Sequence, residues 1–343
     1  MKKNKIFVLL CAITALMIAS CSKKAENELN AGNAQDASRK SINNVAAAES
    51  SFRIIGYIQD WADVDQVQFD KLTHINYAFA MPNADGTIND VDKPNVLRSV
   101  VAKAHANGVK AFISIGGGTA EALEAFNALA SSPKSRATFR IALLEFVDKY
   151  SLDGADIDWE YPVKNETDVD YSALMQQLSI SLHNDGKQLS GVVSGSYGDF
   201  IRPSVFAQVD WINILAYDEG TTNHSTLDIA QRSLDHWLGM GLSPAKAMLG
   251  VPFYGLSPTQ EALSFASLLA QGANPDSDVF NDYGYNGITT IKTKTDLAYQ
   301  RGNGIMIWNV GQDAVGANSL LSAIYAEVQK LESSAAKKSV AKK

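Results

Sequence analysis

Residues 153–162 read Asp-Gly-Ala-Asp-Ile-Asp-Trp-Glu-Tyr-Pro, a stretch in which acidic and apolar side chains alternate. Successive side chains of a β-strand point to opposite faces, so Asp156, Asp158 and Glu160 share one face. The other face carries the apolar side chains of Ile157, Trp159 and Tyr161. If the apolar face packs against helices, the three carboxyls point toward the axis of a parallel barrel, near the C-terminal mouth where barrel enzymes build their sites.

The rest of the chain supports an α/β fold of this kind. Eight short, nearly continuous apolar runs alternate with longer amphipathic segments, as in parallel sheets that are covered on both faces. The strand candidates are 53–58, 73–79, 110–115, 154–159, 189–194, 211–216, 247–252 and 305–309. The helix candidates are 95–106, 136–150, 171–182, 227–239, 293–301 and 314–331. We therefore predict a (β/α)₈ barrel (TIM barrel) over residues 51–331.

The N-terminal residues are expected to lie outside this barrel. Lysines at positions 2, 3 and 5 precede an apolar run over residues 6–18. This run is shorter than the about 20 residues that span a bilayer, and it is typical of a signal peptide, here residues 1–20. Residues 18–21, Ile-Ala-Ser-Cys, resemble a bacterial lipobox, which predicts lipidation of Cys21. The alternative is a plain signal peptide with an incidental cysteine.

Polar segments are expected to flank the barrel. Residues 21–50 are rich in Ala, Asn and Ser without an apolar period, which predicts a flexible tether. Residues 332–343 hold four lysines and are expected to form a disordered basic tail. With a lipid on Cys21, we expect an exported protein anchored to a bacterial cell membrane, at the outer membrane or the cell surface.

Composition excludes several classes of function. The formal net charge of −7 offers no general attraction for nucleic acid, and no nucleic-acid partner is expected. The two cysteines, Cys11 and Cys21, both lie near the N-terminus, which leaves the barrel without a disulfide or a cysteine metal site. The five histidines show no ligand spacing, so no metal and no cofactor are expected. We expect a monomer.

Two bland interpretations of the acidic stretch compete with a catalytic one. A solvated edge strand would explain the acids but not their apolar neighbours. A calcium loop that starts at Asp156 would need Gly at its sixth position and Glu at its twelfth, where the chain has Tyr161 and Thr167. In a confined pocket, repulsion and desolvation raise the pKa of at least one of three neighbouring carboxyls, which supplies a proton donor near neutral pH.

The motif D-G-x-D-x-D-x-E, filled by Asp153, Gly154, Asp156, Asp158 and Glu160, resembles the signature of glycoside hydrolase family 18, the chitinase family. Further stretches follow in the family's order. Residues 114–117 resemble S-x-G-G, residues 215–218 resemble M-x-Y-D, and residues 250–255 and 304–308 resemble the seventh and eighth strands. The resemblance covers residues 53–331. Many members insert a module between strands seven and eight, and we expect no sizeable insertion here.

The resemblance implies a role for each residue at the site. Glu160 would be the acid and base, and Asp158 would stabilise the substrate's N-acetyl group, whose oxygen attacks the anomeric carbon to form an oxazolinium ion. Asp156 would share a proton or hydrogen bond with Asp158, and Tyr217 would bind the acetamido oxygen. Substrate-binding roles would fall to Trp308, Asp218, Tyr57, Phe79 and Leu215, which replaces the usual Met. Support would come from Asp153, Ser114, Gly116 and Gly117.

Each supporting residue also has an ordinary explanation. Tyr217 and Trp308 are candidates for plain packing, and Trp61 is either an outer sugar platform or a loop aromatic. Glycines at 116–118 match no phosphate-loop pattern and are more consistent with close backbone packing beside the acidic strand.

The resemblance predicts retaining, endo-acting hydrolysis of β-1,4-linked N-acetylglucosamine in chitin or its oligosaccharides. An endo-β-N-acetylglucosaminidase that cuts the chitobiose core of N-glycans is the rival enzyme. A sugar-binding lipoprotein without activity is the rival from another class, although such proteins usually lose the acid at the position of Glu160.

Overall fold

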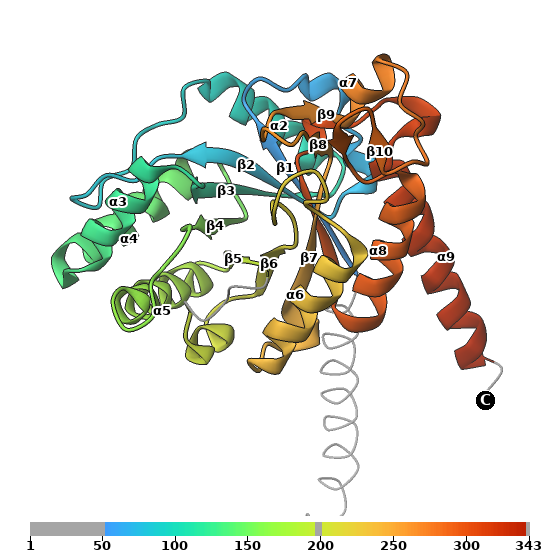
Figure 1. Cartoon of the computed structure of the whole chain (residues 1–343). Coiled ribbons are helices and arrows are strands. Elements are labelled where there is room, and N and C mark those ends of the chain that lie inside the picture. The colour runs from blue at the N-terminus through green and yellow to red at the C-terminus, as the bar shows by residue number, and fades with distance from the viewer. Residues whose placement is uncertain (1–51, 196–200, 341–343) are drawn as a thin grey trace, which may run out of the picture. The chain divides into compact units, whose positions relative to one another are not determined.

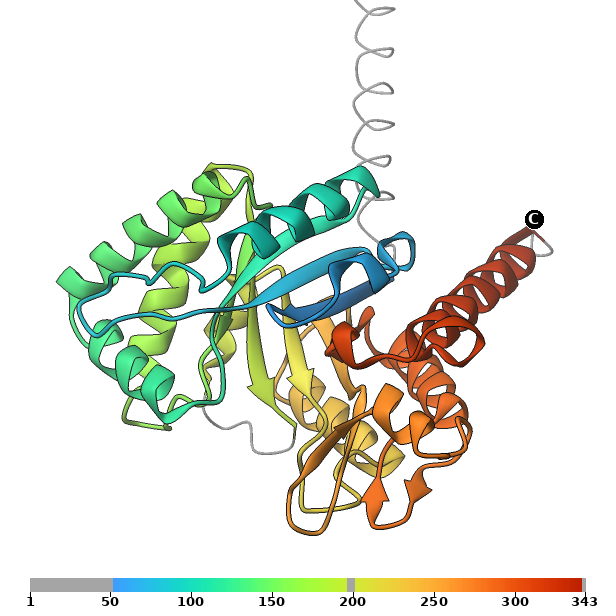
Figure 2. The same ribbon diagram turned by 90° about the horizontal axis from the view of Figure 1, so that it is seen from above.

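The computed structural model describes residues 52–195 and 201–340. Its centre is a closed barrel of eight parallel strands in the order β1-β12-β7-β6-β5-β4-β3-β2 (Figures 1 and 2). The strands are β1 (Arg53–Gln59), β2 (His74–Ala80), β3 (Lys110–Gly116), β4 (Gly154–Asp158), β5 (Gln188–Ser194), β6 (Trp211–Leu215), β7 (Ala247–Pro252) and β12 (Gly304–Trp308). All eight agree with the sequence prediction to within one residue, which confirms the predicted TIM barrel.

Helices cover the outside of the barrel. They are α2 (Pro94–Ala106), α3 (Ala120–Ala130), α4 (Pro133–Lys149), α5 (Asp168–Asn184), α6 (Leu227–Gly239), α8 (Ile288–Arg301) and α9 (Leu320–Val340). The sequence prediction did not include α3. Thr119 begins this helix by accepting a hydrogen bond from the backbone N–H of Ala122, and Phe126 buries its ring against the barrel.

In the described parts of the segments that follow β1 and β5, the structure has only 3₁₀ turns where the fold usually has a helix. These turns are Val64–Gln66 and Phe69–Lys71 after β1, and Pro203–Ala207 after β5. Further 3₁₀ turns cover Pro244–Lys246, Val310–Gln312 and Gly316–Asn318. The expected disordered tail is wrong for residues 332–340, which continue α9. This stretch of Glu, Ala, Lys and Ser contains no Gly or Pro to end a helix.

A small antiparallel sheet lies between β7 and β12. Its strands, β8 (Tyr254–Leu256), β9 (Ala262–Ser264), β10 (Val279–Phe280) and β11 (Tyr283–Gly284), pair in the order β10-β11-β8-β9. The helix α7 (Phe265–Ala270) packs on it, and Figure 1 shows both above α8. No sizeable insertion was expected at this point, and the strands of two or three residues agree with that. The sequence did not reveal that they form a sheet.

The apolar face of β4 packs outward against the helices. The ring of Trp159, just past β4, stacks on Phe126 of α3 with ring centroids 5.1 Å apart and meets the edge of Tyr171 from α5. Tyr161 departs from the predicted alternation, because β4 ends at Asp158 and Tyr161 turns into the barrel mouth instead of facing the helices. The acidic face points inward, as predicted.

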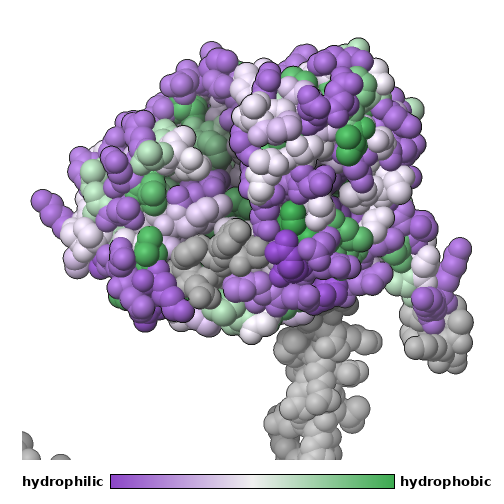
Figure 3. Space-filling model, in the orientation of Figure 1, coloured by the Kyte–Doolittle hydropathy of each residue, from purple (hydrophilic) through white to green (hydrophobic). Residues whose placement is uncertain are grey.

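Hydrophilic side chains cover most of the face seen in Figure 3, and hydrophobic ones form small separate groups. Among the described residues, no helix is both long and apolar enough to cross a bilayer. The expected signal peptide, the lipidation site Cys21 and the tether to residue 50 lie outside the described residues.

Candidate active site

A cavity of about 290 Å³ opens at the C-terminal ends of the barrel strands. Its walls come from β1, β2, β4, β6 and β12 and from the turns that follow β3, β4 and β6. The lining residues are Tyr57, Phe79, Gly118, Asp158, Glu160, Tyr161, Leu215, Tyr217, Asp218 and Trp308. The structure therefore brings together all the residues for which the sequence predicted a position at the pocket wall. Gly118 and Tyr161 are additional.

Asp156 lies beneath this cavity with no exposed surface. Strand register places Ser114 of β3 and Ser190 of β5 beside it, and Tyr57 and Asn213 reach it from β1 and β6. Oδ2 accepts hydrogen bonds from Tyr57 Oη at 2.7 Å and Ser114 Oγ at 2.8 Å. Oδ1 accepts from Ser190 Oγ at 2.6 Å and Asn213 Nδ2 at 3.1 Å. Burial raises the pKa of Asp156, and the four donors oppose that shift.

These donors determine the charge of Asp156. Each carboxylate oxygen has two lone-pair positions, and both positions on each oxygen are occupied by a donor. Donors in all four positions stabilise the carboxylate form, so we take the group to be anionic. Asp156 does not form the expected hydrogen bond with Asp158 in this structure. Donors from four other strands occupy the Asp156 oxygens instead.

Asp158 contacts Glu160 instead. Burial is the largest cause of the raised pKa of both carboxyls. For Asp158, the charges of Glu160 and then Asp156 add to the effect, and its pKa lies well above the usual value. The two neighbouring carboxyls, Asp158 buried and Glu160 half-buried, cannot both ionise freely above an anion, so the pair retains a proton. Asp158 Oδ1 is buried and has no hydrogen-bond partner among the described residues.

Tyr217 and Asp218 follow β6 and form another side of the cavity. Tyr217 is 8% exposed, and among the described residues its hydroxyl has one hydrogen-bond contact, to the weak acceptor Met306 Sδ at 4.0 Å, so it makes no strong hydrogen bond. Burial raises its pKa well above the usual value. Asp218 has a positive φ of 60°, and its Oδ1 accepts a hydrogen bond from Tyr254 and contacts His224 Nδ1. Tyr217 thus supplies a neutral hydrogen-bond donor, and Asp218 supplies an acceptor.

Aromatic rings make the floor of the cavity. Trp308, at the end of β12, stacks on Phe79 with centroids 5.5 Å apart and meets the edge of Tyr57 at 5.6 Å. Flat apolar surface of this kind suits the apolar face of a ring-shaped ligand. Trp61 is 52% exposed and is not among the lining residues, although its ring lies close to Gly311 in the turn after β12.

The glycines after β3 let the backbone approach the acidic strand. Gly116 has φ +110°, and a Cβ there would lie 2.3 Å from the carbonyl oxygen of Asp158. Gly117 donates its N–H to that same oxygen at 2.8 Å. A Cβ on Gly118 would lie 3.1 Å from Glu160 Oε1. The glycines therefore shape the cavity wall beside the two carboxyls, as close packing predicted.

Asp153 lies at the opposite end of β4, outside the cavity. Its Oδ2 accepts the backbone N–H of Ala111 at 2.8 Å and contacts His105 Nε2 at 2.8 Å, which ties β4 to β3 and to the end of α2. This position agrees with the expected support at the start of the strand. Among the described residues, no group of three or more His, Cys, Asp or Glu side chains is arranged to hold a metal ion.

Sequence reasoning missed Ser190, Asn213 and Tyr161. Ser190 and Asn213 lie on strands that are distant in sequence, and only the barrel register brings them to Asp156. Once the strands are assigned, inward-pointing polar residues in otherwise apolar strands are a usable signal, and both residues fit it. Tyr161 had no such signal, since the local alternation predicted the other direction.

Comparison with known proteins identifies relatives of this barrel. The family model described as "Glycosyl hydrolases family 18" matches residues 53–313. The crystal structure of a chitinase from the chitin utilization locus of Flavobacterium johnsoniae is 30% identical, with a TM-score of 0.74, and the match covers 82% of this chain and 95% of that one. A chitinase structure from Bacteroides thetaiotaomicron is 26% identical with a TM-score of 0.76, over 81% and 97% of the two chains.

Curated sequences give a consistent result. A probable chitinase of Drosophila melanogaster is 29% identical in an alignment of 262 residues, and the match covers 62% of this chain but only 11% of that protein. The chain spans less than two thirds of the length of the first curated relatives that it matches.

Proposed function

The chain belongs to glycosyl hydrolase family 18, and on that premise we propose that it is a chitinase that cleaves β-1,4-linked N-acetylglucosamine with retention. The observation that carries the proposal is the contact between Asp158 and Glu160 at the bottom of the cavity, above a buried anion. Such a pair holds a proton near neutral pH and releases it to a substrate oxygen. The aromatic floor beside it suits a pyranose ring.

Glu160 is the proposed acid and base. It donates its proton to the glycosidic oxygen as the bond from that oxygen to the anomeric carbon breaks. Glu160 then accepts a proton from the water that attacks the same carbon. A raised pKa, caused first by burial, favours the protonated form that begins the cycle. The Asp158 carboxyl does not attack the anomeric carbon in this proposal.

The substrate's own acetamido group is the proposed nucleophile. Its carbonyl oxygen bonds to the anomeric carbon from the face opposite the leaving group, which gives an oxazolinium ion. Asp158 Oδ1, buried and without a partner among the described residues, accepts the acetamido N–H. The hydroxyl of Tyr217, which has only a weak contact to Met306 Sδ among the described residues, donates to the carbonyl oxygen and holds it in line. Water opens the ring from the original face, so two inversions give retention, and intramolecular attack has a large proximity advantage.

The small sheet after β7 supports internal cleavage. Its strands of two or three residues add little wall to the cavity, and none of the residues from β8 to β11 is among those that line it. An open site accepts the middle of a chain, so we propose endo action on soluble chitin chains.

A digest of chitin hexamer, analysed by mass spectrometry, tests the proposal. Wild type is expected to release dimers and trimers, and Glu160→Gln none. An N-glycosylated protein is digested in parallel. Glycan release that leaves one N-acetylglucosamine on this protein, with an intact hexamer, would instead assign an endo-β-N-acetylglucosaminidase. Binding of the hexamer without any cleavage would assign a sugar-binding protein.

The anomer of the first product tests the mechanism separately. NMR spectra taken in the first minutes should show the β-anomer. An initial α-anomer would rule out the oxazolinium route even if chitin is cleaved.

We also propose that the protein is exported and lipid-anchored through Cys21, as a monomer. The basic start, the short apolar run and the Ile-Ala-Ser-Cys stretch support this. Labelled palmitate should appear in the wild-type protein and be lost in Cys21→Ser. Labelling that persists in the variant would contradict the anchor. Light scattering of the purified barrel should give the mass of one chain.

A further inference from the structure

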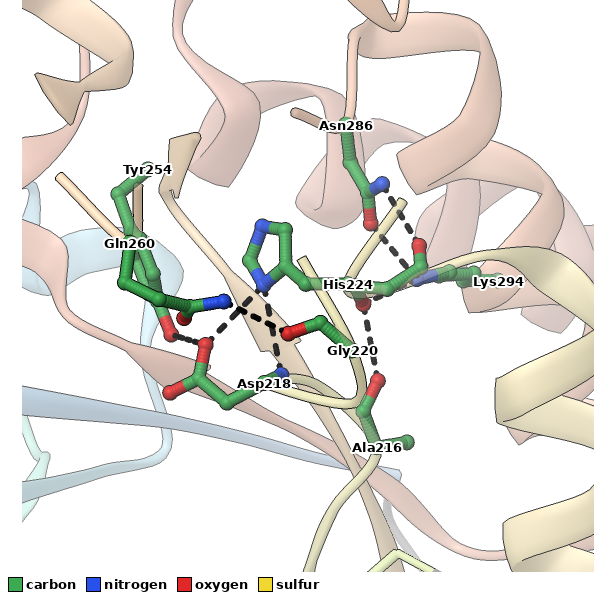
Figure 4. A network of polar contacts seen from close by, with 9 residues as sticks. Ala216, Asp218, Gly220, His224, Tyr254, Gln260, Asn286 and Lys294 are labelled. Carbon is green, nitrogen blue, oxygen red and sulfur yellow. Dashed lines mark hydrogen bonds and ion pairs between the residues drawn. The ribbon is translucent and has the colours of Figure 1, made fainter. Parts of the chain in front are cut away.

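A buried lysine lies behind the wall of the cavity that Tyr217 and Asp218 form. Lys294, on α8, has no exposed surface. Its Nζ lies 2.6 Å from the carbonyl oxygen of Ser225, 2.7 Å from Ser225 Oγ and 2.6 Å from Asn286 Oδ1 (Figure 4). All three are acceptors, and only the charged ammonium form has three hydrogens to give them. The network therefore fits a lysine that is buried with its charge.

Burial of the Lys294 charge costs desolvation free energy, so a lysine at this position calls for a specific role. Burial lowers the pKa of Lys294 to about 7, and Asp278 acts weakly in the opposite direction. Among the described residues, no carboxylate forms an ion pair with it. An apolar side chain of similar length would avoid the desolvation cost. Packing of α8 alone therefore does not account for a lysine with three hydrogen bonds at this position.

The hydrogen bonds continue from Lys294 to the cavity. Ser225 Oγ, which accepts from Lys294, donates to the carbonyl oxygen of Ala216 at 2.8 Å. Ala216 directly precedes Tyr217. Asn286 Nδ2 also donates to the carbonyl oxygen of Ser225 at 2.8 Å, so two side chains hold the same carbonyl. The path from the ammonium group to the backbone beside Tyr217 contains only one side chain.

The outer side of the same loop has separate anchors. Tyr254, on β8, donates to Asp218 Oδ1, and Gln260 Nε2 donates to the carbonyl oxygen of Gly220 at 2.8 Å (Figure 4). Within the loop, the backbone N–H of Glu219 donates to the carbonyl oxygen of His224. The loop of residues 216–225 is therefore held from outside by the small sheet and from inside by Lys294.

We propose that Lys294 is a positioning residue: through Ser225 it fixes the backbone at Ala216, and so directs the Tyr217 hydroxyl and the Asp218 carboxylate into the cavity. The catalytic part of this inference depends on the proposed function, because it assumes that Tyr217 contacts the reacting acetamido group. The structural part does not, and it predicts a local effect on the loop in the protein without substrate.

The test uses Lys294→Met, which keeps the length and removes the three donors. Thr295→Val is the matched control, because Thr295 is next to it on α8 and equally buried, and its hydroxyl bonds, among the described residues, only to Ile291 of its own helix. Hydrogen exchange should become faster over residues 216–226 in Lys294→Met and not over the strands β1 to β4. Thr295→Val should leave exchange in the loop unchanged.

Kinetics with chitin hexamer give the second readout. Lys294→Met should lower kcat by about 10- to 100-fold with little change in KM, since a small misplacement of a positioned group has an effect of this size. In a Tyr217→Phe background the same change should have a much smaller effect than in wild type, because the part that acts through the Tyr217 hydroxyl is already lost. If Lys294→Met does not fold, Ser225→Ala replaces it, since that change removes the hydroxyl between the lysine and Ala216.

The two experiments distinguish a positioning role of Lys294 from a general structural role. Faster exchange throughout the barrel, or equal effects in Lys294→Met and Thr295→Val, would overturn the inference and leave Lys294 a general structural residue. Additive losses in the Tyr217→Phe background would overturn it as well. If wild type does not cleave chitin, the proposed function fails, and the exchange experiment alone decides whether Lys294 holds the loop.

Discussion

Tyr57 donates a hydrogen bond from its hydroxyl to Asp156 Oδ2 over 2.7 Å, and this bond joins β1 to β4 inside the barrel. The same tyrosine ring meets the edge of Trp308, 5.6 Å away between centroids. One side chain therefore connects the buried anion to the aromatic floor. Because Asn213 Nδ2 donates to both Tyr57 Oη and Asp156, the orientation of the tyrosine hydroxyl is determined by its neighbours.

Tyr57→Phe removes this hydroxyl and keeps the ring. Asp156 loses one of its four donors, and a buried acceptor that loses a partner costs about 1–3 kcal/mol. We expect the free energy of unfolding to fall by that amount in urea titrations and kcat to fall about tenfold. KM should change little, because the contact with Trp308 remains.

Tyr77→Phe is the matched control on the neighbouring strand. The Tyr77 hydroxyl is buried and has no hydrogen-bond partner among the described residues. Its removal should leave both the free energy of unfolding and kcat nearly unchanged. Equal losses in the two variants would mean that the hydrogen bond to Asp156 has no special value.

Asp156→Asn should change the pH dependence of cleavage. The negative charge of Asp156 helps to raise the pKa of Asp158, with which Glu160 shares its proton. Without that charge the pair loses its proton at lower pH, so the alkaline limb of kcat/KM should move to lower pH, by about one unit. The measurement is kcat/KM from pH 4 to 9 with a chromogenic oligosaccharide.

Asp153→Asn is the control for this profile. Asp153 lies at the far end of β4 and contacts Ala111 and His105, outside the cavity. Its replacement should lower stability without moving either limb. A limb that stays in place in Asp156→Asn, or moves to higher pH, would contradict the charge assigned to Asp156.

The sequence predicted most of the barrel because its strands are locally distinct. Continuous apolar runs of five to seven residues between amphipathic helices leave few other arrangements, and the DGADIDWEYP stretch marks one strand end by itself. The roles of the residues at the cavity wall came from the family resemblance, whose motifs lie near or just after the C-terminal ends of strands.

Other features depend on contacts that are distant in sequence. Ser190 and Asn213 reach Asp156 only through barrel register, and the strands of the small sheet are too short for a periodic signal. Local alternation failed at Tyr161, because a strand pattern says nothing about the chain after the strand ends. The sequence around Lys294 is typical of an exposed helix residue, and only the packing of α8 in the structure shows that this side chain is buried.

Two glycines beside the carboxyls should respond differently to alanine. Gly116→Ala places a Cβ 2.3 Å from a backbone oxygen at φ +110°, which strains the backbone, and we expect a loss of about 2 kcal/mol or more in stability. Gly118→Ala has no positive φ, and its Cβ would lie 3.1 Å from Glu160 Oε1. We expect it to fold normally, with a clearly reduced kcat.

Thermal unfolding and kinetics together check this pair. The expected pattern is a lowered Tm in Gly116→Ala and an unchanged Tm in Gly118→Ala. A Gly118→Ala protein with full activity would show that Glu160 has more room than the structure gives it.

Trp308→Ala should weaken binding more than it slows chemistry. The ring covers the cavity floor and stacks on Phe79, and loss of a large apolar contact surface of this kind costs roughly 1.5–3 kcal/mol. That energy corresponds to an increase of about 10- to 100-fold in Kd for the hexamer, measured by calorimetry in the Glu160→Gln background. Trp308→Phe retains an aromatic face and should recover most of the affinity. Trp61→Ala distinguishes a second sugar platform from a loop aromatic, because only a platform would weaken hexamer binding while leaving dimer binding unchanged. If Trp308→Ala binds the hexamer as well as its parent does, the ring belongs to the packing of the barrel and not to the sugar site.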